Sequence, residues 1–178
     1  MRPMVALRSG RLDLRFVAGT DVGFVESLYA SADVTRTLLR IQRPISRQEA
    51  RELCTAPSAE SGEHRFVGVL RASDQPIGAG TVRAHAARGG MASIGYSILP
   101  AFWRQGIGTE LARLLVEFSF GTLGAVEVRA TTLHDNIASA RVLEKLGFAT
   151  LDEAARETDS RGAERRVIRW RLRREVRS

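Results

Sequence analysis

Alternating apolar and polar positions mark the strands in the amino-terminal half of this chain. A strand that is buried on one face turns every second side chain toward the core. This alternation, interrupted by turn residues such as Ser73–Pro76, predicts four strands: Arg11–Val17, His64–Arg71, Ile77–Arg83 and Met91–Leu99. Short turns join the last three strands, and we expect these to form an antiparallel meander.

Two helices are expected between the first and second of these strands. Thr20 is a residue type that caps helix amino termini, and the segment after it predicts a helix that ends near Ser31. Ser46 and Glu49 have the spacing of a capping box, in which each side chain accepts a hydrogen bond from the other residue's amide. A second helix should therefore start after Ser46 and end near Cys54.

Helical spacing replaces alternation after Pro100. Apolar side chains recur every three or four residues within Ile107–Phe120, which predicts a long helix. A shorter helix should follow Asn136 and end at Gly147. The residues expected on its buried side are Ile137, Ala140, Leu143 and Leu146.

Three further strands complete the pattern: Ala125–Thr131, a strand from Phe148 onward, and Glu164–Leu172. The succession of strands and helices is typical of an α/β fold, in which a mixed sheet carries helices on its faces. A chain of 178 residues fits a single domain, which we expect to span residues 1–178.

Composition narrows the classes of function. No apolar run reaches the ~20 residues that cross a membrane, and the amino terminus lacks the apolar stretch of a signal peptide, so we expect a cytoplasmic protein. The single cysteine, Cys54, excludes an internal disulfide and is expected to be a packed thiol. Because His64, His85 and His134 lack metal-ligand spacing, no metal site is expected.

The formal net charge is +7, and arginine carries nearly all of the positive charge, because Lys145 is the one lysine. Such a balance suggests an acidic partner or nucleic acid. The arginines are spread along the chain except for Arg165–Arg177, and this segment contains a single aromatic residue, Trp170. A nucleic-acid-binding domain is therefore an alternative that the pattern does not favour.

The first segment with candidate chemistry joins a strand to a helix through a glycine-containing loop. The strand stops at Pro100, and Gly106-x-Gly108 opens the next helix. The first amides of a helix lack intrahelical partners and carry partial positive charge, so they attract phosphate groups. Glycines let a pyrophosphate approach these amides. The segment lacks the ending of a P-loop and the third glycine of a dinucleotide fingerprint.

A second segment follows about thirty residues later and reads NIASARVLEKLGF, from Asn136 to Phe148. Together with IGYSILPAFWRQGIGT, which is Ile94–Thr109, it resembles the GNAT acetyltransferases, and in particular the branch of the ribosomal-protein alanine N-acetyltransferases. The resemblance is close over residues 94–148, and the order of the elements before them agrees loosely. Two motifs at this separation are far more specific than Gly-x-Gly alone.

The resemblance implies a GNAT fold: a mixed sheet of about seven strands, splayed at its centre and flanked by about four helices, with acetyl-CoA in the opening. The splayed strands would be Met91–Leu99 and Ala125–Thr131. Strand backbone and Asn136 would hold the pantetheine arm, and the glycine loop would hold the pyrophosphate. The implied coenzyme-binding residues are Ser97, Ile98, Leu99, Arg104, Gln105, Gly106, Ile107, Gly108, Thr109, Asn136 and Arg141.

The implied activity is transfer of the acetyl group to a primary amine, which attacks the thioester directly in a ternary complex. The amide of Ile98 or a neighbour would stabilise the oxyanion. Many GNAT enzymes protonate the leaving thiolate with a tyrosine, but this chain has Leu143 there, which cannot donate a proton. The branch resembles enzymes in which a serine assists the thiolate, and Ser139 occupies that place.

The general base and the acceptor are less defined. Related enzymes use a carboxylate beyond the second motif, so Glu157 is the candidate base, with Asp159 and Glu164 as rivals. Tyr96 is either an acceptor-site residue or a packed strand aromatic, and Trp103 is expected to anchor its loop.

The acceptor would be a protein amino terminus or a small-molecule amine. It would lie between the first two helices, the loop at residues 84–90 and the final strands. A homodimer is compatible with the resemblance. Since Leu143 replaces the tyrosine, a module that binds acetyl-CoA without turnover is the alternative function.

Overall fold

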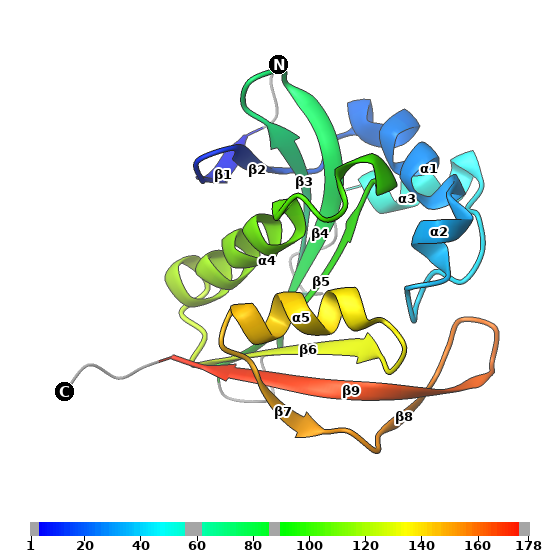
Figure 1. Ribbon diagram of the computed structural model, residues 1–178. Coiled ribbons are helices and arrows are strands. Elements are labelled where there is room, and N and C mark those ends of the chain that lie inside the picture. Colours follow the sequence, from blue (N-terminus) through cyan, green and yellow to red (C-terminus); the bar gives the residue numbers. More distant parts are fainter. Residues whose placement is uncertain (1–3, 56–61, 86–89, 175–178) are drawn as a thin grey trace.

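One mixed sheet organises the chain in the computed structural model, which describes residues 4–55, 62–85 and 90–174. Its strands are β1 Val5–Arg8, β2 Leu12–Phe16, β3 Glu63–Leu70, β4 Gln75–His85, β5 Met91–Ile98, β6 Glu127–Leu133, β7 Ala149–Asp152, β8 Arg156–Thr158 and β9 Glu164–Arg173. Among the described residues they pair in the order β1-β2-β3-β4-β5-β6-β9-β7, and β8 pairs with β9 (Figure 1).

Helices cover both faces of this sheet. They are α1 Val22–Ala30, α2 Ala32–Thr35, α3 Arg47–Cys54, α4 Ile107–Glu117 and α5 Ile137–Lys145. In Figure 1, α4 lies on one side of β3, β4 and β5, and α1, α2 and α3 lie on the other side. A π-helical turn, Phe118–Thr122, extends α4. No helix in the described ranges combines the length and apolarity that a membrane span requires.

The expected α/β fold is confirmed. All seven predicted strands are present, and β1 and β8 are additional. The capping box of α3 forms as predicted, since Ser46 Oγ accepts from the Glu49 amide at 3.2 Å and Glu49 accepts from the Ser46 amide at 2.7 Å. Cys54 is buried, as expected for a packed thiol.

Two local predictions are wrong. Thr20 does not cap the first helix: a 3-10 turn, Gly19–Asp21, precedes α1, and Asp21 accepts from the Ala18 amide and pairs with Arg15 at 2.6 Å. Ile137 is 55% exposed because it stands at the first turn of α5, outside the face that packs on the sheet. Residues 56–61, 86–89 and 175–178, which include parts of the expected loops and of the basic run, lie outside the described residues.

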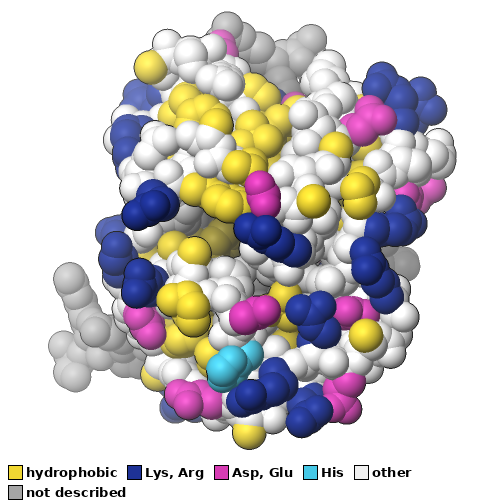
Figure 2. Space-filling view, turned by 45° about the vertical axis from the view of Figure 1, so that its right-hand side comes forward, with side chains coloured by type: hydrophobic (Ala, Val, Ile, Leu, Met, Phe, Trp, Pro, Cys, Tyr) yellow, Lys and Arg dark blue, Asp and Glu magenta, His cyan; other side chains and the backbone are white. Residues whose placement is uncertain are grey.

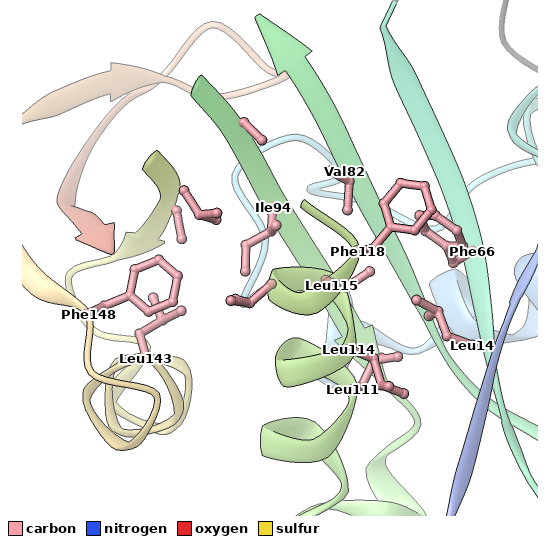
Figure 3. Packing of buried hydrophobic residues seen from close by; sticks show 14 of the residues in the cluster. Leu14, Phe66, Val82, Ile94, Leu111, Leu114, Leu115, Phe118, Leu143 and Phe148 are labelled. Carbon is pink, nitrogen blue, oxygen red and sulfur yellow. The ribbon is translucent and has the colours of Figure 1, made fainter. Parts of the chain in front are cut away.

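The main core lies between α4 and the sheet (Figure 3). Leu111, Leu114 and Leu115 are the fully buried face of α4 that the helical spacing predicted. The helix α4 can approach β4 closely because a glycine, Gly80, stands at the contact. A Cβ at this position would lie 2.9 Å from the Leu115 side chain. Phe118 then meets the ring of Phe66, with ring centroids 4.8 Å apart.

The sheet is open at its centre. β5 and β6 are parallel neighbours, but they pair only from Met91 to Ser93, opposite Glu127–Arg129. Beyond Ser93, β5 stays with β4, while β6 follows β9 over its whole length. The strands therefore diverge toward their carboxyl ends, and the predicted central splay is confirmed.

Packing of α4 on the sheet should dominate stability. We expect Leu115→Ala to lower the free energy of unfolding by about 3 kcal/mol, because it removes a fully buried side chain and leaves a cavity against Gly80. Val126→Ala, at a side chain that is 56% exposed, should change it by less than about 0.5 kcal/mol. Urea denaturation followed by circular dichroism measures both, and equal losses would contradict this placement of the core.

Candidate active site

Two cavities occupy the opening between β5 and β6. The first, of about 460 Å³, lies between the start of α4, the end of β5 and α5, and is called the α4–α5 cavity. The second, of about 570 Å³, lies between β3, β4, β5, β6 and residues 37–41, and is called the central cavity. Figure 2 shows this side of the molecule hollowed near its centre, with hydrophobic atoms inside and Lys and Arg side chains beside the hollow. The residues that line both cavities are Thr37, Leu38, Tyr96, Asn136 and Ser139.

The start of α4 presents unpaired amides to the α4–α5 cavity. The first intrahelical bond runs from the Glu110 amide to the Gly106 carbonyl, at 3.1 Å, so the three preceding amides have no partner within the helix. Gly106 has a φ of 77° and Arg104 a φ of 61°, so both residues have a left-handed backbone conformation where the loop joins the first turn of α4. A side chain at Gly106 would be strained in this conformation.

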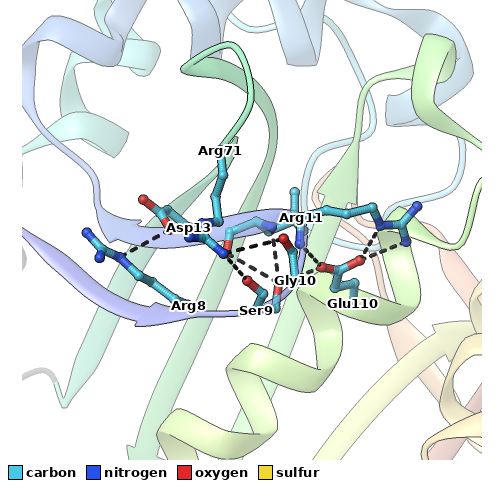
Figure 4. A network of polar contacts seen from close by, with 8 residues as sticks. Arg8, Ser9, Gly10, Arg11, Asp13, Arg71 and Glu110 are labelled. Atoms are coloured by element: carbon cyan, nitrogen blue, oxygen red, sulfur yellow. Dashed lines mark hydrogen bonds and ion pairs between the residues drawn. The ribbon is translucent and has the colours of Figure 1, made fainter.

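A network of polar contacts joins the glycine loop and the first turn of α4 to the turn between β1 and β2 (Figure 4). Glu110, on the first turn of α4, accepts from Ser9 Oγ at 2.5 Å and from the Arg11 amide and Nε at 2.8 and 2.7 Å. Arg11 also donates to the Gln105 carbonyl at 3.1 Å. Burial alone would raise the pKa of Glu110, but these donors lower it. The charged carboxylate thus holds the β1–β2 turn to the glycine loop.

The charged side chains that line the α4–α5 cavity are cationic. Arg104, Arg141 and Lys145 line it, and among the described residues no Asp or Glu does. Within the described part of the chain none of the three forms an ion pair. Together with the amides of α4, they make this cavity suited to a polyanion.

One edge of β5 is free to bond with a ligand. The Leu99 amide donates to the Ile77 carbonyl at 2.9 Å, and in an antiparallel ladder alternate residues bond to the same neighbour. Ser97 and Leu99 therefore turn their backbone groups toward β4, while Tyr96 and Ile98 turn theirs toward the opening. Trp103 Nε1 donates to the Ile98 carbonyl at 2.8 Å, which anchors the loop as expected.

A hydrogen-bonded hydroxyl pair stands where the cavities meet. Tyr96 Oη and Ser139 Oγ are 2.9 Å apart, and each residue lines both cavities. Burial raises the pKa of Tyr96 to about 12, although the bond to Ser139 lowers it. A phenol is neutral at physiological pH even at its ordinary pKa of ~10, so Tyr96 is a hydrogen-bond donor in this site.

The Asn136 side chain forms hydrogen bonds to two different segments beside the cavities. Its Oδ1 accepts from the Ser139 amide at 3.1 Å and caps α5, as its position in the motif suggested. Its Nδ2 donates to the Thr37 carbonyl at 3.1 Å, which ties α5 to the segment after α2. Asn136 thus sets the position of Ser139 and of residues 37–41.

The three carboxylates considered as the base lie in different surroundings. Glu157 lines the central cavity, with Arg169 Nε at 3.3 Å from its Oε1. Asp159 is buried in the β8–β9 turn, where it accepts from the Arg161 and Ala163 amides, and it does not line the cavity. Glu164 is exposed and pairs with Arg156.

The predicted coenzyme-binding residues gather around one cavity. Those that line the α4–α5 cavity are Ser97, Ile98, Arg104, Gly106, Gly108, Thr109, Asn136 and Arg141. The Ile107 side chain packs in the core, with 3% of its surface exposed, while its amide is one of the three at the start of α4 that have no partner within the helix. The Gln105 amide group donates to the Ala101 carbonyl at 2.8 Å, and Leu99 does not line either cavity.

Sequence reasoning missed several residues of the site. Glu110 and Arg11 are about one hundred positions apart, and no pattern in the chain links them. Arg40 and Glu63 line the central cavity, but each stands in a segment of ordinary polarity. Lys145 belonged to the second motif and could have been found, because it lies four residues after Arg141 on the same helix face. No group of His, Cys, Asp and Glu in the described ranges is arranged to hold a metal.

Comparisons with known proteins agree with this geometry. The family model "Acetyltransferase (GNAT) domain" matches residues 11–149. The chain is 30% identical to the uncharacterised N-acetyltransferase YoaA of Bacillus subtilis, over 80% of this chain and 81% of YoaA.

Two solved structures have a similar fold. The spermidine N-acetyltransferase from Vibrio cholerae, in complex with CoA and spermine, superposes with a TM-score of 0.80 at 19% identity, over 93% of this chain and 96% of that one. A ribosomal L7/L12 α-N-protein acetyltransferase in complex with coenzyme A gives 0.79 at 19% identity, over 96% and 98%.

The tyrosines offer a direct test of the buried hydroxyl pair. The chain has two, Tyr29 and Tyr96, and burial raises the pKa of each. At pH ~10.5 an exposed tyrosine is mostly ionised. We therefore expect the native protein to show roughly half or less of the tyrosinate absorbance of the urea-unfolded chain.

The pKa of Tyr96 also predicts how stability depends on pH. Unfolded tyrosine ionises near pH ~10, whereas native Tyr96 ionises near 12, so its contribution to stability is complete below pH ~10 and is lost as pH rises toward 12. Tyr96→Phe should remove this loss from the alkaline stability profile. A wild-type titration that already matches the unfolded chain at pH ~10.5 would contradict the burial.

Proposed function

The chain belongs to the GNAT acetyltransferase family and is an acetyl-CoA-dependent N-acetyltransferase, and we propose that acetyl transfer takes place where its two cavities meet. The observation that carries this proposal is the hydrogen-bonded pair of Tyr96 and Ser139, which lines both cavities. In this arrangement the α4–α5 cavity holds the coenzyme and the central cavity holds the amine.

The residues of the α4–α5 cavity fit acetyl-CoA. The amides at the start of α4 suit the pyrophosphate, and three unpaired cations, Arg104, Arg141 and Lys145, suit the phosphate oxygens. The open edge of β5 offers the backbone groups of Tyr96 to the amides of the pantetheine arm, since the Ile98 carbonyl already accepts from Trp103. Bound acetyl-CoA supplies an activated acyl group, whose transfer leaves a thiolate and places negative charge on the carbonyl oxygen.

The chain supplies donors for both charges. The Ile98 amide faces the opening and donates to the carbonyl oxygen. Ser139 donates its hydroxyl proton toward the thiolate. Tyr96 is a neutral phenol and a stronger donor than an aliphatic hydroxyl, so Tyr96 donates to Ser139 and leaves the serine hydroxyl free to donate a hydrogen bond to the sulfur. Leu143, which is fully buried, takes no part in this transfer.

Glu157 is the base of this proposal. Of the three carboxylates considered as the base, it is the one that lines the central cavity. Glu63 lines the cavity too, but hydrogen bonds from Arg83 and Arg65 outweigh the effect of burial and lower its pKa, which makes it a weaker base. The base accepts a proton from the acceptor ammonium, directly or through water, so that the neutral amine attacks.

Coenzyme binding can be tested with one glycine. We expect isothermal titration to show micromolar binding of acetyl-CoA, and Gly108→Glu to weaken it at least about tenfold, because a carboxylate would meet the phosphates. A Cβ at Gly108 has 3.8 Å of clearance, so the variant should fold. Gly23→Glu, on α1 in open space, adds the same charge and should bind normally. A folded wild-type protein that does not bind acetyl-CoA would contradict the proposal.

Ser139 can be separated from coenzyme binding by kinetics. We expect Ser139→Ala to lower kcat by about 10²-fold, as loss of one donor to developing charge does elsewhere, with the Kd for acetyl-CoA unchanged. The cap on α5 uses the backbone amide of residue 139 and survives this change. Ser27→Ala, at an exposed position on α1, is the matched control. If Ser139→Ala retains wild-type kcat, the proton donor is another group.

A further inference from the structure

The central cavity is positively charged. Arg40, Arg65, Arg83 and Arg129 line it against Glu63 and Glu157, a formal charge of +2. A half-enclosed cavity screens charge less than open solvent does, so this excess acts on any molecule that enters. The cavity therefore favours an acceptor that carries negative charge in addition to its amine.

Both carboxylates of the cavity already have partners. Glu63 pairs with Arg65 at 2.6 Å and also with Arg83, so one carboxylate faces two guanidinium groups. Glu157 pairs with Arg169 at 3.3 Å. A second ammonium group on the acceptor would have to compete with these arginines for a carboxylate and would be repelled by their charge, which opposes binding of a polyamine.

Arg40 differs from the other three arginines of the cavity. Arg65 and Arg83 bond to Glu63, and Arg129 bonds to Glu127 at 2.7 Å. Across the described ranges, Arg40 forms no ion pair, although it lines the cavity and is exposed. It is thus the guanidinium of the central cavity that is available to an anionic ligand.

The segment that carries Arg40 is held on both sides. Asn136 Nδ2 donates to the Thr37 carbonyl at 3.1 Å, and the Ser160 amide donates to the Leu39 carbonyl at 3.3 Å. Arg165 then donates to the side-chain oxygen of Gln42 at 3.1 Å. These bonds attach residues 37–42 to α5 and to the β8–β9 turn, beside which Figure 1 places the loop. Arg40 therefore stands on a fixed backbone at the cavity.

We propose that the acceptor is a primary amine that also carries a carboxylate, and that Arg40 binds this carboxylate in the central cavity. This inference rests on the proposed function of the cavity as the acceptor site. The same positive charge opposes protonation of the bound amine and so favours the neutral form that attacks. The carboxylate can belong to a free amino acid or to an acidic residue of a peptide near its amino terminus.

The test compares acceptors that differ in one group. Release of CoA thiol is measured with the tripeptide amides Ala-Glu-Ala, Ala-Gln-Ala and Ala-Lys-Ala, with alanine and alaninamide, and with spermidine. We expect kcat/KM to be at least about tenfold higher for an acidic member than for its neutral match, in the peptide pair or in the amino-acid pair. The pair that shows the preference identifies the source of the carboxylate. Equal rates within both pairs, or a preference for spermidine or Ala-Lys-Ala, would overturn the inference.

Variants of Arg40 test whether this residue causes the preference for an acidic acceptor. Arg40→Gln should lower the acidic-to-neutral ratio of kcat/KM about tenfold, and Arg40→Lys should restore part of it. Arg36→Gln makes the same charge change on an exposed residue that pairs with Asp33 and lines neither cavity, so it should keep the ratio. An unchanged ratio in Arg40→Gln would remove Arg40 from the site. Loss of acetyl-CoA binding, or no turnover of any acceptor, would instead refute the proposed function itself.

Discussion

The early divergence of β5 from β6 is the constraint on which the site depends. Three residue pairs join the two strands, and then β5 keeps β4 as its one neighbour. Had the parallel ladder continued, the backbone groups of Tyr96 and Ile98 would bond to β6 and the cavities would close. Backbone groups without partners in a cleft are costly unless water or a ligand satisfies them. The divergence therefore leaves backbone groups on this edge of β5 that water or a ligand can satisfy.

The opening is held apart by bonds that surround it. Trp103 ties the glycine loop to the end of β5, Glu110 ties the start of α4 to the β1–β2 turn, and Asn136 ties α5 to residues 37–41. Each bond joins a rigid element to a loop at the rim of a cavity. On the proposed function, coenzyme and acceptor would bind to a site whose loops are already held in place, which lowers the ordering entropy that binding would otherwise cost.

Local sequence patterns predicted the strands, the helices and the coenzyme motifs, but they did not predict the contacts between residues far apart in the sequence. Alternation and helical spacing located the strands, and the Gly106-x-Gly108 and Asn136 motifs located the α4–α5 cavity, because each depends on neighbours in the sequence. Thr20 was misread as a cap because a tertiary bond to Arg15 placed Asp21 there instead. The sequence placed the acceptor cleft beside the first two helices, and Val25, Tyr29 and Leu53 of these helices do line the central cavity, but the rest of this cavity could not be predicted. Its lining comes from segments as distant as Arg40 and Glu157, and only the folded register of β8 and β9 brings them together.

The division between these two cavities also explains how one fold serves different acceptors. The α4–α5 cavity is built from backbone groups and motif residues, so it follows from the fold that the chain shares with a spermidine N-acetyltransferase. The central cavity is built from side chains on β3, β6, β8 and a loop, positions that can change without disturbing the sheet. On the proposed function, a similar backbone would constrain the coenzyme and leave the acceptor site free to vary. If the central cavity is the acceptor site, as proposed, the charges of those side chains, and Arg40 above all, select the amine that this chain accepts.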